Sequence, residues 1–133
     1  MSDNGPKHPA HADRDPVEVG FSEAACLEGL GGDRALLGEI AAAFLAYGPT
    51  AMAAATDALD RGDADALART AHTLKGSLTH FRADKPVAAA LALERCARDG
   101  DLDAAAAALN TLRRQIDFLL AALAPLAAHT GRK

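Results

Sequence analysis

Apolar residues recur along most of the chain at spacings of three and four, which is the period of an α-helix with one buried face. Residues suited to cap a helix precede these runs, at Ser22, Asp33, Asp63 and Asp101. Glycines that end helices follow them, at Gly31, Gly62 and Gly100. The pattern predicts five helices, over about residues 23–30, 34–61, 64–82, 86–99 and 101–125.

Two prolines bear on these helices. Pro49 lies within the second one, whose pattern resumes on the far side, so we expect one bent helix there. Pro125 is expected to end the last helix. The connections between the four long helices are short, which favours antiparallel neighbours. The predicted fold is therefore all-α: an up-down antiparallel four-helix bundle with a short extra N-terminal helix at one end.

The composition agrees with one all-α domain. Aromatic residues make up 4% of the 133 residues, tryptophan is absent, and β-branched residues show no strand-like alternation. We expect a flexible N-terminal tail over residues 1–20, a helical bundle over 21–128 and a C-terminal tail over 129–133. His8 and His11 in the first tail lack a third ligand, so no metal site is expected there.

The formal net charge of -4 and the pI near 5.6 give no electrostatic case for binding nucleic acid or an anionic membrane. Residues 1–20 contain no apolar run of the kind found in signal peptides or membrane anchors. Cys26 and Cys96 are expected to be buried free thiols, which fits a reducing cytoplasm. We therefore expect a cytoplasmic monomer that holds no metal or cofactor of its own.

One predicted helix presents a histidine to solvent. Its apolar stripe consists of Leu67, Ala71, Leu74, Leu78 and Phe81. At roughly 100° per residue, the centre of this stripe lies about 140° around the helix from His72. The imidazole should therefore project away from the core. One turn further along the same face stand Lys75 and Gly76.

Gly76 is unexpected within a helix, because a glycine there lowers helix stability by about 1 kcal/mol relative to alanine. Its place beside His72 supplies a reason, since a glycine leaves the imidazole uncovered and lets a second molecule approach closely. Lys75 adds a mobile positive charge near the ring. These features favour an anion bound near His72, and the anion we expect is a phosphoryl group.

The run Ala71-His72-Thr73-Leu74-Lys75-Gly76-Ser77 resembles the signature of histidine-containing phosphotransfer (HPt) domains. Phe81 falls where that family usually has an apolar residue closing the helix, and Leu93-Glu94 resembles the Leu-Glu pair on its next helix. The similarity extends over roughly residues 20–128. The sequence departs from the family's pattern at His80, where many members have Asn, and at Arg82, where many have Gly.

The resemblance implies a relay in two-component signal transduction. His72 would accept a phosphoryl group on Nε2 from the aspartyl phosphate of a receiver domain and pass it to another receiver aspartate. Lys75 would neutralise part of the phosphoryl charge, and the receiver would bring a magnesium ion. The implied partners are response-regulator receiver domains and a hybrid sensor histidine kinase. Without a nucleotide loop, the chain is expected to be a phosphoryl carrier that has no ATP-dependent kinase activity.

Glu94 has two interpretations. The resemblance implies, from its distance after the histidine, that its carboxylate holds Nδ1 of His72 and fixes the tautomer that leaves Nε2 free. The spacing also fits a surface ion pair with Arg98, four residues further on. Arg69 and Arg98 are candidates either for contacting the phosphoryl group or for being solvated charges.

Two further alternatives stay open. Leu36, Ile40 and Ala43 widen the apolar arc of their helix, so either the first helix covers them or they form part of an exposed docking patch. The function also has an alternative, in which the protein is a helical adaptor that binds a response regulator without being phosphorylated. A His72→Gln substitution separates the two functions, because the carrier alone depends on imidazole chemistry.

Overall fold

The computed structural model describes the backbone of residues 21–130 and the side chains of residues 21–127. The predicted N-terminal tail, with His8 and His11, and residues 131–133 lie outside the described residues. Between residues 21 and 130 all regular elements are helical: α2 (Glu23–Gly29), α3 (Arg34–Asp60), α4 (Ala64–Leu78), the 3₁₀ turn η2 (Thr79–Phe81), α5 (Asp84–Arg98) and α6 (Leu102–Thr130). The predicted all-α class is confirmed.

The caps expected from the sequence are formed. The side chains of four residues accept hydrogen bonds at 3.0–3.1 Å from backbone amides three residues further on: Ser22, Asp33, Asp63 and Asp101. Gly62 and Gly100 follow α3 and α5 with φ angles of 69° and 74°, which glycine adopts at no steric cost. α5 begins at Asp84, two residues before the predicted start, and Pro86 lies in its first turn.

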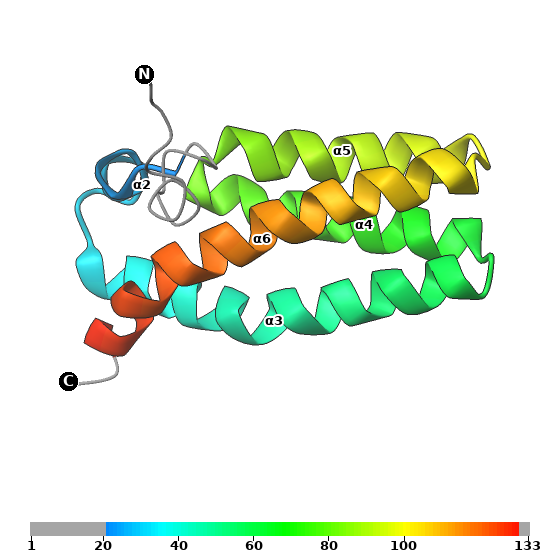
Figure 1. Ribbon diagram of the computed structural model, residues 1–133. Helices are drawn as coiled ribbons and strands as arrows, with labels where there is room; N and C mark the ends of the chain where they lie inside the picture. Colours follow the sequence, from blue (N-terminus) through cyan, green and yellow to red (C-terminus); the bar gives the residue numbers. More distant parts are fainter. Residues whose placement is uncertain (1–20, 131–133) are drawn as a thin grey trace, which may run out of the picture.

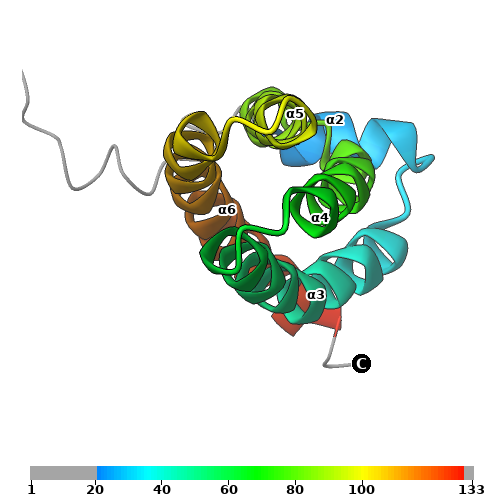
Figure 2. The same ribbon diagram turned by 90° about the vertical axis from the view of Figure 1, so that its right-hand side faces the viewer.

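The four long helices enclose one apolar core. α3 packs against α4 and α6, and α5 packs against the same two helices, while α2 lies at one end (Figures 1 and 2). All four long helices contribute large side chains that are almost fully buried: Leu37, Leu67, Leu74, Leu78, Leu93, Leu112, Ile116, Leu119 and Leu123. This packing fixes the rotation of α4 about its own axis, and with it the direction in which its polar residues project.

Both Pro49 and Pro125 lie inside helices. α3 continues through Pro49 as a single helix, as predicted. α6 also continues through Pro125, to Thr130, so the predicted end of that helix is wrong. Pro125 is exposed and removes one backbone hydrogen bond, whereas Leu126 and Ala127 beyond it are half-buried against the core. Burial of these two side chains favours continuation of the helix.

Two contacts join α2 to the end of the histidine-bearing helix. The buried thiol of Cys26 donates a hydrogen bond to the carbonyl of Phe81 at 2.9 Å, and burial raises the pKa of this thiol. The guanidinium of Arg82 donates to the carbonyl of Ala25 at 3.1 Å. Arg82 itself adopts a left-handed conformation, with φ of 53°, that glycine takes at lower cost.

Cys96 is only half-buried, so the expectation of a buried thiol is correct for Cys26 alone.

α3 also bears on the expectation that the chain does not bind membranes. Within residues 21–130 it is the one helix long and apolar enough to cross a membrane, with a mean hydropathy of 1.3. Its buried stripe, which includes Ala41, Phe44 and Ala55, belongs to the bundle core. A core helix of a bundle has the same length and composition as a membrane span, so these two properties assign no membrane segment.

Candidate functional site

His72 lies near the middle of α4 and points away from the core. Its side chain is 61% exposed, whereas Leu67, Ala71 and Leu74 on the other side of the helix are fully buried. The spacing of apolar residues along α4 produces this orientation, because burying the stripe turns the opposite face outward. The structure therefore places an accessible imidazole on the surface of the bundle.

Gly76, one turn further along the same face, is exposed and borders open space. A Cβ atom built on it would meet no neighbouring atom within 4 Å. No packing contact requires a glycine here, so nothing in the fold offsets its unfavourable helix propensity. The residue leaves exposed backbone one turn from the imidazole, with open space through which a partner could approach.

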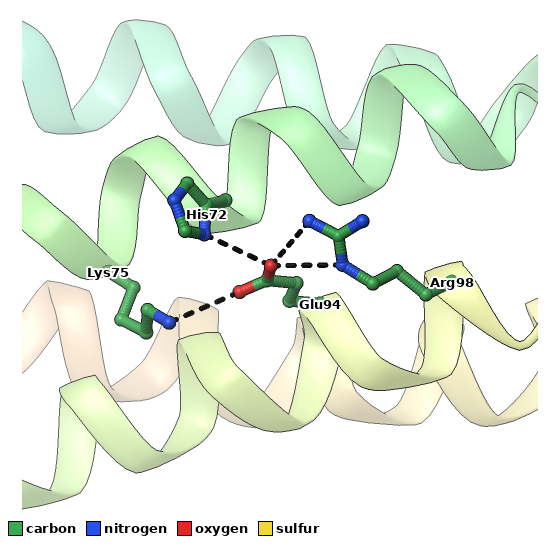
Figure 3. Close-up of polar contacts among 4 residues, drawn as sticks. All are labelled: His72, Lys75, Glu94 and Arg98. Atoms are coloured by element: carbon green, nitrogen blue, oxygen red, sulfur yellow. Dashed lines mark hydrogen bonds and ion pairs between the residues drawn. The ribbon is translucent and has the colours of Figure 1, made fainter.

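Glu94 of α5 contacts the imidazole from the neighbouring helix. Its Oε2 atom lies 3.0 Å from Nδ1 of His72, and Glu94 is only 6% exposed (Figure 3). The same oxygen accepts hydrogen bonds from Nη2 and Nε of Arg98, at 2.7 and 3.0 Å. The two sequence-based interpretations of Glu94 are thus compatible, because one carboxylate makes both contacts.

Lys75 faces Glu94 as well. Its Nζ atom lies 3.4 Å from Oε1 of Glu94, and its side chain is 27% exposed (Figure 3). The sequence led us to expect a mobile cation directed at an anion, whereas in the structure the ammonium pairs with a protein carboxylate. At 3.4 Å the contact is longer than a charge-assisted hydrogen bond, so the ammonium keeps donors for a second acceptor.

The neighbours of Glu94 keep its carboxyl group ionised. The hydrogen bonds from Arg98 lower its pKa most, the contacts with His72 and Lys75 lower it further, and burial opposes them. An ionised carboxylate can only accept, so the proton in the contact with His72 belongs to Nδ1. Nε2, on the side of the ring away from Glu94, is then the nitrogen with the free lone pair.

Arg69 lies apart from this cluster. It lines a hollow between α3 and α4 together with Tyr47, Thr50, Ala51, Ala54, Thr70 and Thr73. Among residues 21–127, the cations that contact Glu94 are Lys75 and Arg98. No group of three or more His, Cys, Asp or Glu side chains that could hold a metal ion occurs in the part of the chain that the structure describes.

A second hollow, of about 260 Å³, lies between the N-terminal half of α3 and the end of α4. It is lined by Ile40, Ala43, Phe44, Tyr47, Ser77, His80 and Phe81. Leu36 nearby is 38% exposed and Ala43 is exposed, so cover by the first helix is wrong for these two residues. Sequence spacing could not indicate that Tyr47 and His80 line the same hollow, because they lie on different elements.

A model of the Hpt domain family matches residues 39–122, a range that contains His72, Lys75, Gly76 and Glu94. An all-helical fold that exposes His72 on its surface agrees with this match. The chain belongs to the Hpt domain family. No curated protein and no solved structure matched the chain.

Proposed function

We propose that the protein is a phosphorelay intermediate, which accepts a phosphoryl group on His72 from the aspartyl phosphate of one receiver domain and passes it to another. Family membership supports a role in two-component phosphotransfer, since Hpt domains interact with receiver domains and kinases in phosphorelays. The observation that carries the proposal is the exposed imidazole whose Nδ1 contacts Glu94.

Nε2 is the nucleophile in the transfer step. Its lone pair attacks the phosphorus atom of the aspartyl phosphate, a P–N bond forms, and the P–O bond to the aspartate breaks with release of the carboxylate. The phosphorylated ring retains the proton on Nδ1 and gains positive charge, which the adjacent carboxylate of Glu94 stabilises. Transfer to a second receiver aspartate reverses these bond changes.

Lys75 and Gly76 assist this step in different ways. Phosphoryl transfer depends on positioning and on neutralising charge at the equatorial oxygens. Lys75 contacts the same carboxylate that contacts His72, so we assign it a share in that neutralisation. Gly76 leaves room for the receiver, because no side chain stands beside the ring at that position. Magnesium would be bound by the receiver.

We infer that the protein acts as a cytoplasmic monomer without kinase activity of its own, and that its partners are receiver domains and a hybrid sensor histidine kinase. We also infer that the four long helices form an up-down antiparallel bundle. Connections of a few residues between α3 and α4, α4 and α5, and α5 and α6 support this topology.

Phosphoryl transfer from a purified, phosphorylated receiver domain tests the proposal. Wild-type protein should take up phosphate in an acid-labile form, and H72Q should take up none. The matched control is H80Q, which removes another exposed histidine, in η2 directly after α4, and should transfer normally. Binding of a receiver without any phosphate uptake by the wild type would favour the adaptor function instead.

A further inference from the structure

Three hydrogen-bonding contacts converge on one oxygen atom of α5. Nη2 and Nε of Arg98 lie 2.7 and 3.0 Å from Oε2 of Glu94, and Nδ1 of His72 lies 3.0 Å from the same atom (Figure 3). The other carboxylate oxygen faces Lys75. Arg98 therefore shares its acceptor with the imidazole instead of occupying a separate oxygen.

We propose that Arg98 is a positioning residue for phosphoryl transfer, which acts through Glu94 and sets the tautomer of His72. The inference rests on the proposed function of His72. The positive charge of Arg98 alone would suggest direct contact with the phosphoryl group. The proposed role requires no such contact.

Arg98 determines where the proton lies between His72 and Glu94. A guanidinium has five N–H donors and no acceptor, and it stays protonated in proteins. An oxygen that receives two of these N–H groups must act as an acceptor, so Oε2 carries no proton. The third contact then requires a hydrogen atom on Nδ1, and Nε2 keeps its lone pair.

Arg98 also restricts the position of the carboxylate. A glutamate side chain has three rotatable bonds, and one at the edge of a core can turn toward solvent. Arg98 follows Glu94 by four residues, so the two side chains meet on one face of α5 and the guanidinium holds Oε2 with two donors. This restraint keeps Oε2 in reach of the imidazole.

The carboxylate of Glu94 contacts two cations besides the imidazole, Lys75 of α4 and Arg98 of α5. Its negative charge is therefore shared among three partners. Arg69 of α4 lies outside this cluster, in the hollow that it lines with Tyr47 of α3.

Three variants of the full chain separate this role from a structural one. R98M removes the donors but keeps a long side chain, and R98K keeps the charge but not the guanidinium. R95M is the matched control, because Arg95 is an exposed arginine of the same helix and forms no ion pair or side-chain hydrogen bond with the described residues. Thermal unfolding shows whether each variant folds.

The first readout is the ¹⁵N NMR spectrum of the unphosphorylated His72 ring, assigned by its loss in H72Q, at a pH where imidazoles are neutral. Wild type and R95M should show a protonated Nδ1 and an unprotonated Nε2. R98M should show a mixture of the two tautomers, and R98K an intermediate result. The second readout is the transfer rate from a phosphorylated receiver, which R98M should lower by about fivefold, near the upper limit for an exposed ion pair.

Ring signals in R98M identical to those in R95M overturn the proposal, because the ion pair would then affect stability alone. Slower transfer with unchanged ring signals also overturns it and indicates direct contact with the phosphoryl group. A change in the tautomers of R98M with an unchanged transfer rate shows that the tautomer does not limit transfer. That result also overturns the proposal. If the wild type accepts no phosphoryl group, the proposed function fails, whereas the ring signals still decide whether Arg98 acts on His72.

Discussion

Nδ1 of His72 in α4 lies 3.0 Å from Oε2 of Glu94 in α5, the next long helix along the chain. The contact joins an exposed imidazole to an almost buried carboxylate. The packing of α4 against α5 therefore orients the ring, and the rigid core rather than a mobile loop supports the site.

Gly76 offers a test in which stability and function change in opposite directions. G76Q should raise the free energy of unfolding by about 0.5 kcal/mol, because glutamine is the better helix former and its Cβ meets no neighbour. Transfer from a phosphorylated receiver should fall on the order of tenfold or more, because the side chain blocks close approach. G76A should stabilise the helix with a smaller loss of transfer. A wild-type transfer rate in G76Q would show that open space at this position is unimportant.

Lys75 is expected to contribute through its charge. K75M should slow transfer by about tenfold, the lower end of what a hydrogen bond to a charged group supplies. K85M is the control, because Lys85 is an exposed lysine at the start of α5 that forms no ion pair with the described residues. Equal transfer rates in the two variants would remove Lys75 from the mechanism.

The pKa of Glu94 gives a pH dependence of stability. Hydrogen bonds from Arg98 in particular lower this pKa in the folded protein, so the unfolded chain binds the proton more readily. The stabilisation is present above the ordinary pKa of 4.5 and is lost as the pH falls through the folded pKa. The difference in unfolding free energy between wild type and E94Q should therefore be constant near neutral pH and shrink below about pH 4.5. A difference that stays constant into the acid range would contradict the lowered pKa.

Arg82 combines an unfavourable backbone conformation with a favourable contact to Ala25. R82A loses the contact and keeps the left-handed conformation, whereas R82G loses the contact but removes the steric cost. Chemical denaturation should find R82A less stable than R82G by about 1 kcal/mol. In both variants, amide hydrogen exchange in α2 should become faster. Unchanged exchange would mean that Arg82 does not hold α2 in place.

The sequence predicted the helices and the outward direction of His72 because both follow from local rules. The three-four spacing that ends at Phe81 fixes which face of α4 is buried, and the capping side chains fix where helices start. The rule that proline ends helices failed at Pro125, because burial of Leu126 beyond it depends on contacts with the rest of the bundle.

The polar cluster was only partly predictable. Spacing within α5 indicated that Glu94 and Arg98 meet, and the family resemblance indicated that Glu94 faces His72. Neither showed that one oxygen serves both contacts, because that depends on the distance between α4 and α5. The pairing of Lys75 with Glu94, in place of a free ammonium, depends on the same distance.

The position of the phosphoryl group on the phosphorylated protein tests the central claim most directly. After transfer from a phosphorylated receiver to protein labelled with ¹⁵N in histidine, NMR can show which ring nitrogen is bonded to phosphorus. The geometry at Glu94 predicts a P–N bond to Nε2 of His72, with the proton retained on Nδ1. A phosphoryl group on Nδ1, or on any residue other than His72, would contradict it.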